Sequence, residues 1–230
     1  MERVKTGVTG LDDMLSGGIP NGFVIAVAGG PGSGKSILAT QFIWQGIQQN
    51  EDGLFILLSG EGNEVIAQAS QFGYQLDNNP KFHFFIQGGD TENMTEQIQR
   101  HIEQFGIRRV VIDSISLFNV YQRAQRETAT RGSNYSADAL ASKDNRMIID
   151  EIRSYKDVTT MVLVEDYDSM PIEDKVIKFA CDGVIKISVN SVLGIRSITV
   201  EKMRETNHPL TASAFEITQT GIVLRSMKSD

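Results

Sequence analysis

The chain has 230 residues, which is long enough for one sizeable hydrophobic core and short for two. Hydrophobic residues make up 40% of the chain and charged residues 22%, the composition of an ordinary soluble globular domain. The net charge of −7 argues against a surface that grips nucleic acid throughout, because duplex binding depends on lysine and arginine; a local basic loop stays compatible with it.

Targeting features point to the cytoplasm. The single Cys181 cannot form an internal disulfide, which predicts a reducing compartment. The opening residues MERVKTGVTG lack the apolar core of a signal peptide. No apolar stretch approaches the roughly 20 residues that span a bilayer. We therefore expect a cytoplasmic protein without a membrane segment.

Strand-like and helix-like runs alternate along most of the chain. We expect strands over 24–29, 54–58, 82–86, 108–114 and 159–165, with helices over 36–49, 63–72, 91–105 and 144–156. This alternation predicts an α/β fold with a mainly parallel sheet flanked by helices. After about residue 183 the strand-like runs 183–188, 195–203 and 214–224 follow one another through short turns. They predict an antiparallel extension at the C-terminal end of one domain that spans residues 1–230.

The stretch 121–146 departs from this rhythm. It is polar and carries several arginines, with Gly132, Ser133 and Asn134 near its middle. One interpretation is a solvated loop that is partly helical. The other is a mobile functional loop that faces a partner or the centre of a ring.

The strongest motif follows the first long strand and precedes a helix. The residues Gly29, Gly30, Pro31, Gly32, Ser33, Gly34, Lys35 and Ser36 fit the G-x-x-x-x-G-K-[ST] pattern of a phosphate-binding loop. Its glycines let backbone N–H groups surround a polyphosphate, and the helix that follows, starting near Ile37, offers the positive end of its dipole. We expect Lys35 to reach the β- and γ-phosphates of ATP and Ser36 to ligate Mg²⁺.

A second magnesium anchor is expected at the end of another buried strand. Asp113 closes the run RRVVIDS and fits this role, acting through a water because Mg²⁺ keeps much of its hydration. The alternative is an aspartate that caps the next element.

The motifs around this loop resemble those of the RecA-like ATPases of the KaiC and RadA group. The resemblance is carried, in chain order, by Thr6-Gly7, Gly10-Leu11-Asp12, Leu15, Gly17-Gly18-Ile19-Pro20, Phe72-Gly73-Tyr74, the segment 202–208, Phe215-Glu216-Ile217 and Gly221-Ile222. It covers most of the chain apart from 121–146 and corresponds to a single KaiC-like domain. The resemblance implies a RecA-like P-loop NTPase fold. It also implies a homo-oligomeric ring, a hexamer, in which ATP lies between neighbouring subunits.

The same resemblance implies roles for the segment 202–208. Lys202 and Arg204 would reach the γ-phosphate bound by the adjacent subunit, where a cation stabilises charge that builds in the transition state. Met203, Thr206 and His208 would line that nucleotide. The spacing of Lys202 and Arg204 places both on one face of a strand, which also suits two solvated side chains at a hairpin end.

The chain departs from the group at the end of the second strand. Where KaiC-like domains carry a Glu-Glu pair that polarises the attacking water, alignment on Phe72-Gly73-Tyr74 places Ser59-Gly60. Glu61 lies one residue later, and either its carboxylate turns back to serve as the base or the site lacks an effective one. Glu165 ends the fifth strand, where the group senses the γ-phosphate; a structural salt bridge is the other interpretation.

Three functions remain open from the sequence. The first is an ATP-binding, slowly hydrolysing oligomeric switch that reports its nucleotide state to a protein partner. The second is a recombinase paralogue that binds single-stranded DNA through 121–146, where Tyr121 and Tyr135 accompany arginines. The third is a non-hydrolysing, nucleotide-dependent scaffold, which Ser59-Gly60 favours.

Overall fold

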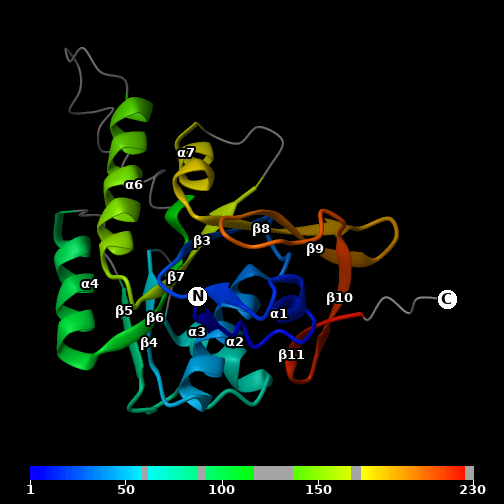
Figure 1. Ribbon diagram of the computed structural model, residues 1–230. Coiled ribbons are helices and arrows are strands. Elements are labelled where there is room, and N and C mark those ends of the chain that lie inside the picture. Colours follow the sequence, from blue (N-terminus) through cyan, green and yellow to red (C-terminus); the bar gives the residue numbers. More distant parts are fainter. Residues whose placement is uncertain (59–61, 87–91, 117–136, 167–171, 226–230) are drawn as a thin grey trace.

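The computed structural model describes residues 1–58, 62–86, 92–116, 137–166 and 172–225 (Figure 1). The elements are, in chain order, β1 (Arg3–Val4), α1 (Leu11–Met14), β2 (Ile19–Pro20), β3 (Val24–Gly29), α2 (Lys35–Gln48), β4 (Asp52–Leu57), α3 (Gly62–Gln71), β5 (Phe82–Ile86), α4 (Glu92–Phe105), β6 (Ile107–Asp113), α6 (Ala137–Ser154), β7 (Thr159–Glu165), α7 (Ile172–Ala180), β8 (Gly183–Asn190), β9 (Ile195–Met203), β10 (Ser213–Thr218) and β11 (Gly221–Leu224).

The main sheet places β3 at its centre. Its strand order is β11-β10-β9-β8-β3-β7-β6-β4-β5, and β1 pairs with β2 in a separate small sheet. The strands from β8 to β5 in this order pair in parallel, whereas β9, β10 and β11 extend the sheet through antiparallel pairs. The predicted α/β fold with an antiparallel C-terminal extension is therefore confirmed.

Both faces of the sheet are covered, which explains the continuous apolar strands. Alternate residues of β3 enter two clusters: Ile25 and Val27 pack with α2 and α3, and Val24 and Ala26 pack with α4, α6 and α7. Figure 1 shows these two groups of helices on opposite sides of the sheet. The carboxyl ends of β3, β6 and β7 therefore meet at one edge, where ligands of such sheets bind.

Most predicted elements are confirmed within a residue or two, and one is longer than expected. The helix predicted over 144–156 is α6, which begins at Ala137, so the backbone of 137–146 is helical, as the interpretation of 121–146 as partly helical allows. Residues 121–136 of the expected loop lie outside the described residues. Sequence patterns did not predict α1, α7, β1 or β2. No helix in the described part of the chain has the length and apolarity that crossing a membrane requires.

A buried arginine near the start of β6, at the end of the sheet away from the phosphate loop, links three parts of the fold. Arg109 on β6 is 1% exposed, and its guanidinium stacks over the Phe42 ring at 4.7 Å. It donates to Glu51 at 2.6 Å, to Gln49 at 2.8 Å and to the carbonyls of Lys5 and Phe42 at 2.7 and 2.9 Å. Burial lowers the pKa of Arg109, against the opposing hydrogen bond and charge of Glu51. These bonds fix α2, whose N-terminus carries the phosphate loop.

Candidate functional site

The loop between β3 and α2 has the backbone that the motif predicts. Gly32 and Gly34 have positive φ angles of 69° and 113°, which favour glycine. A Cβ on Gly29 would lie 2.7 Å from both the Ile187 carbonyl oxygen and Ser33 Oγ. Only glycine fits at this point, so the loop passes close to β8 and turns into the N-terminus of α2.

Lys35 lies inside the curve of this loop. Its Nζ donates to the carbonyl oxygens of Gly29 and Gly30 at 2.9 and 3.0 Å, and it forms an ion pair with Glu165 Oε1 at 2.9 Å. Both side chains are mostly buried, at 7% and 16% exposure. The ammonium is thus held at the centre of the loop, with an acid from the end of β7 beside it.

Glu165 is fixed from its backbone and keeps one carboxylate oxygen unpaired. Its N–H donates to Ser116 Oγ at 2.9 Å. The atoms Glu165 Oε2 and Ser33 Oγ are buried and have no hydrogen-bond partner among the described residues. Buried polar atoms are normally satisfied, so these two orphaned oxygens, one in the phosphate loop and one on the partner of Lys35, indicate a site built for a polar ligand.

Ser36 and Asp113, the two predicted magnesium anchors, are in contact. Ser36 Oγ donates to Asp113 Oδ2 at 2.9 Å, which joins the first turn of α2 to the end of β6. Burial raises the pKa of Asp113 and the charge of Glu165 adds to this, whereas the Ser36 hydrogen bond and the Lys35 charge oppose it. A hydroxyl and a carboxylate side by side are hard oxygen donors, which suit Mg²⁺.

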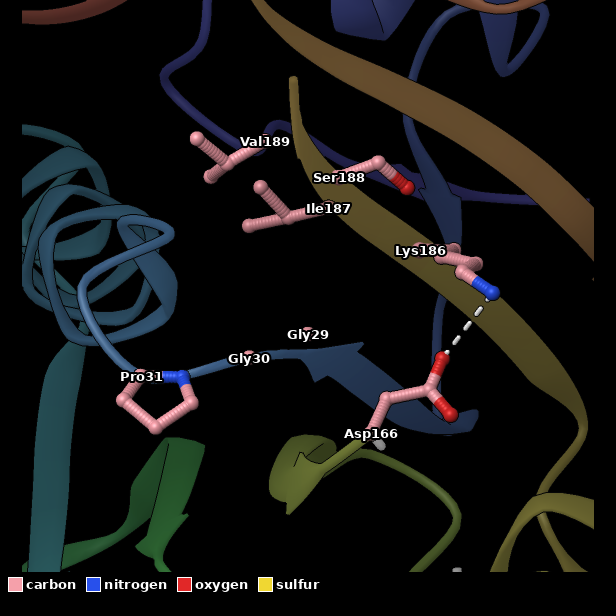
Figure 2. A pocket seen from close by; sticks show the side chains of 8 residues that line it. All are labelled: Gly29, Gly30, Pro31, Asp166, Lys186, Ile187, Ser188 and Val189. Carbon is pink, nitrogen blue, oxygen red and sulfur yellow. Dashed lines mark ion pairs between the residues drawn. The ribbon is translucent and has the colours of Figure 1, made fainter. Parts of the chain in front are cut away.

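A pocket of about 370 Å³ opens between the phosphate loop and β8. Its lining residues are Gly29, Gly30, Pro31, Asp166, Lys186, Ile187, Ser188 and Val189. Figure 2 shows the side chains of Lys186 and Asp166 directed toward one another, and their ion pair measures 3.1 Å. The loop therefore borders open, largely polar space where a phosphorylated ligand can enter.

Lys202 and Arg204 lie at the opposite end of the central strands. Met203 pairs with Gly183, and Gly183 pairs with Ile25 near the start of β3, whereas the phosphate loop follows Gly29 at its end. Gly29 follows Ile25 by four residue steps, or roughly 13 Å along a strand. Arg204 lies beyond this pair, away from the loop, so neither cation lies near the phosphate loop of its own chain.

The remaining residues of the segment 202–208 contact the N-terminal part of the chain. Thr206 Oγ1 accepts a hydrogen bond from Arg3 at 2.6 Å, and Ser16 Oγ donates to the Asn207 carbonyl at 3.0 Å. Met203 is buried in the core, and His208 is half-buried. The structure thus brings together Lys35, Ser36 and Asp113, and it separates them from the predicted residues of 202–208.

Some predicted residues lie outside this cluster or outside the described residues, and two contacts were not predicted. Ile37 lies in the first turn of α2, directly after the loop, and packs partly buried against the core. Glu61, Ser59 and Gly60 lie outside the described residues. Glu165 does form a salt bridge, one of its two interpretations, but its partner Lys35 was not predicted. The contact of Arg204 with Asp182 was not predicted either, because residues far apart in sequence carry no local signal of contact.

Comparison with known proteins identifies the family. A family model described as "ATPase: KaiC" matches residues 4–229. The chain belongs to the KaiC ATPase family. A KaiC-like protein from Pyrococcus horikoshii has a crystal structure that superposes with a TM-score of 0.81 at 26% identity, covering 98% of this chain and 99% of that one.

Two curated relatives agree with this placement. The UPF0273 proteins of Aeropyrum pernix and Thermotoga maritima are 27% and 28% identical to this chain, over 97% of it in both cases and over 94% and 96% of their own lengths. The resemblance to the KaiC group that the motifs carry is therefore confirmed. This KaiC-type chain is a single-domain, RecA-like, nucleotide-binding ATPase.

Proposed function

We propose that this KaiC-type protein binds ATP with Mg²⁺ at the loop 29–36 and hydrolyses it slowly as an oligomeric, nucleotide-dependent switch. The observation that carries this proposal is the convergence of Lys35, Ser36 and Asp113 at one edge of the sheet. Lys35 places a cation where the β- and γ-phosphates meet the loop. Backbone N–H groups at the start of α2 complete the phosphate site.

Ser36 and Asp113 would hold the magnesium ion. The described residues contain no group of three or more His, Cys, Asp or Glu side chains that could hold a metal, and Mg²⁺ in such sites relies on substrate phosphates and water for most of its ligands. The ion supplies charge that neutralises the transferring phosphoryl group. The Ser36–Asp113 contact fits a hydroxyl that ligates the ion directly and a carboxylate that holds its water shell.

The ATP site is shared between subunits in this proposal. Lys202 and Arg204 are separated from their own phosphate loop by the length of the central strands. If they act on a γ-phosphate, that phosphate belongs to a neighbouring copy. A repeated head-to-tail contact of this kind closes into a ring, and the family resemblance favours a hexamer. Hydrolysis is then coupled to assembly.

Hydrolysis is slow in this proposal because Ser59-Gly60 replaces the usual pair of glutamates. Neither residue can take a proton from water at neutral pH, and general-base help is typically worth about 10²–10⁴-fold in rate. Glu61 is the first candidate to restore the base, and Glu165 is the second because it lies beside Lys35. A site without any base would act as a scaffold that binds ATP and releases it unchanged.

Phosphate release measured across protein concentrations, with and without single-stranded DNA, tests the proposal. We expect turnover that needs Mg²⁺, that rises per subunit as the protein assembles, and that is absent in Lys35→Ala. Rates independent of concentration would refute the shared site. Stimulation by DNA would favour the recombinase paralogue, and tight ATP binding without any turnover would favour the scaffold.

A further inference from the structure

Arg204 is tied twice to a single aspartate. Its backbone N–H donates to the Asp182 carbonyl oxygen at 3.0 Å. Its Nη1 donates to Asp182 Oδ1 at 2.7 Å. Both the position of the residue and the direction of its side chain are therefore set by Asp182, which immediately precedes β8.

Asp182 is itself a fixed anchor. Its side chain is 8% exposed, and Oδ2 accepts from the Val24 backbone N–H at 3.1 Å and from Arg153 Nε at 3.3 Å. Its own backbone N–H donates to the Val24 carbonyl at 2.8 Å. These bonds lock the carboxylate in register with the start of β3, the strand that ends in the phosphate loop.

Lys202 and Arg204, at and just after the end of β9, differ in the groups that they contact. Lys202 Nζ donates to the carbonyls of Phe179 and Cys181 at 3.0 and 2.5 Å, at the C-terminal end of α7. Burial is the main cause that lowers the pKa of Lys202, with a smaller contribution from Arg204. The ammonium of Lys202 is therefore engaged within its own chain, where it caps the negative end of a helix.

Arg204 keeps donors for a ligand. Its side chain is 52% exposed, and among the described residues its guanidinium contacts Asp182 through Nη1 alone. The fork of an arginine can hold an acid with one nitrogen and still present others, whereas a lysine ammonium acts as a point charge. Arg153 shares the Asp182 carboxylate with Arg204, and the charge of Lys202 is close enough to interact with it, so three cations face the acids Asp182 and Asp150.

We propose that Asp182 is the positioning residue that holds Arg204 in the orientation in which it meets the phosphates bound by a neighbouring subunit. This inference rests on the proposed shared ATP site. A cation that is already oriented loses little freedom when the neighbour's phosphates arrive, and it stabilises developing charge without reorganisation. Asp182 itself touches no phosphate and acts only through Arg204.

A double-mutant cycle tests this inference. The catalytic rate at saturating ATP is measured for the wild type, Asp182→Asn, Arg204→Ala and the double variant. Misplacement of a catalytic group by about 1 Å can cost about 100-fold, so we expect Asp182→Asn to lower kcat at least about tenfold. In the Arg204→Ala background the same change is expected to cost less than about twofold. Asp150→Asn is the matched control, because it removes the other acid that pairs with Arg153 and leaves Asp182 in place.

A second readout follows Arg204 itself. The NMR order parameter of the Arg204 Nε–H bond is measured in the nucleotide-free protein. We expect a value near that of rigid backbone, about 0.85, in the wild type and in Asp150→Asn, and a value below about 0.6 in Asp182→Asn. A merely structural role of Asp182 would lower stability without loosening this one side chain selectively.

The outcomes separate the two levels of the proposal. Equal losses from Asp182→Asn with and without Arg204, or an unchanged order parameter, would overturn the positioning role. A silent Arg204→Ala in a protein that turns over ATP would overturn the shared site, and the positioning role with it. If the wild type has no turnover, the proposed function fails, and the order parameter alone decides whether Asp182 orients Arg204.

If Asp182→Asn does not fold, a variant of its exposed partner Arg204 still tests the inference. Arg204→Lys keeps the charge but replaces the planar fork with a single nitrogen, so the same atom would have to contact both Asp182 and the phosphate. We expect its kcat to fall nearly to that of Arg204→Ala, with unchanged unfolding temperature because the side chain is half-exposed. A kcat of Arg204→Lys close to that of the wild type would contradict the claim that an arginine guanidinium held by Asp182 is required.

Discussion

Neutralising Glu165 is expected to tighten ATP binding. In the structure the Glu165 carboxylate holds the Lys35 ammonium at 2.9 Å, in a pair whose side chains are 7% and 16% exposed. The phosphates of ATP compete with this carboxylate for the same ammonium and are repelled by its charge. Glu165→Gln keeps an oxygen that can accept from Lys35 and removes the charge, so it favours the nucleotide-bound state.

The size of the effect follows from the contact. A hydrogen bond to a charged group contributes about 1.5–3 kcal/mol, and the glutamine retains part of it. We expect a net gain of roughly 1–2 kcal/mol in binding free energy, which corresponds to an affinity about 5–30-fold higher. The gain is expected to persist at moderate salt, because buried pairs are screened less than exposed ones.

Calorimetry with a non-hydrolysable ATP analogue and Mg²⁺ measures this effect without interference from turnover. Glu216→Gln is the control, because Glu216 also forms an ion pair, with Arg225, but is exposed on β10. Its affinity should match that of the wild type. An unchanged or weaker affinity in Glu165→Gln would refute the competition between this carboxylate and the phosphates.

Three further predictions concern the loop, the base and the support of α2. Lys35→Ala should abolish measurable ATP and ADP binding in a folded protein, and unchanged calorimetric affinity would refute the phosphate site. If Glu61 is the base, Glu61→Gln should abolish most turnover with little change in ATP affinity; in a degenerate site it should be nearly silent, as phosphate-release rates will show. Gly46→Ala would place a Cβ 2.4 Å from Arg109 Cδ. The cost of this overpacking, roughly 1–3 kcal/mol, should exceed the gain of about 1 kcal/mol in helix propensity. We therefore expect the variant to unfold at a lower denaturant midpoint.

The phosphate loop and the sheet could be predicted because their signals are local. The spacing of glycines, Lys35 and Ser36 fixes a backbone shape within eight residues, and the apolar runs 24–29 and 159–165 are buried on both faces. Neither feature depends on distant partners. The antiparallel extension was predictable for the same reason, since its strands follow one another through short turns.

Contacts between distant residues could not be predicted in this way. α7 has nine residues, fewer than the window of roughly 11–18 residues over which helical periodicity can be recognised. The carbonyls that accept hydrogen bonds from Lys202 lie at the end of this helix, so they could not be predicted either. The run RRVVIDS does not reveal that Arg109 is buried while Arg108 is exposed. The partners of Arg109 come from residues 5, 42, 49 and 51, which only the fold brings together.

The most direct test of a shared ATP site is complementation between two inactive variants. Lys35→Ala retains Arg204 but lacks its own phosphate site, and Arg204→Ala retains the phosphate site but lacks the cation. In rings assembled at random from equal amounts, about one interface in four joins an intact phosphate loop to an intact Arg204. The account predicts that mixing restores about a quarter of the wild-type turnover per subunit. A mixture that co-assembles and yet stays as inactive as its parents would contradict it.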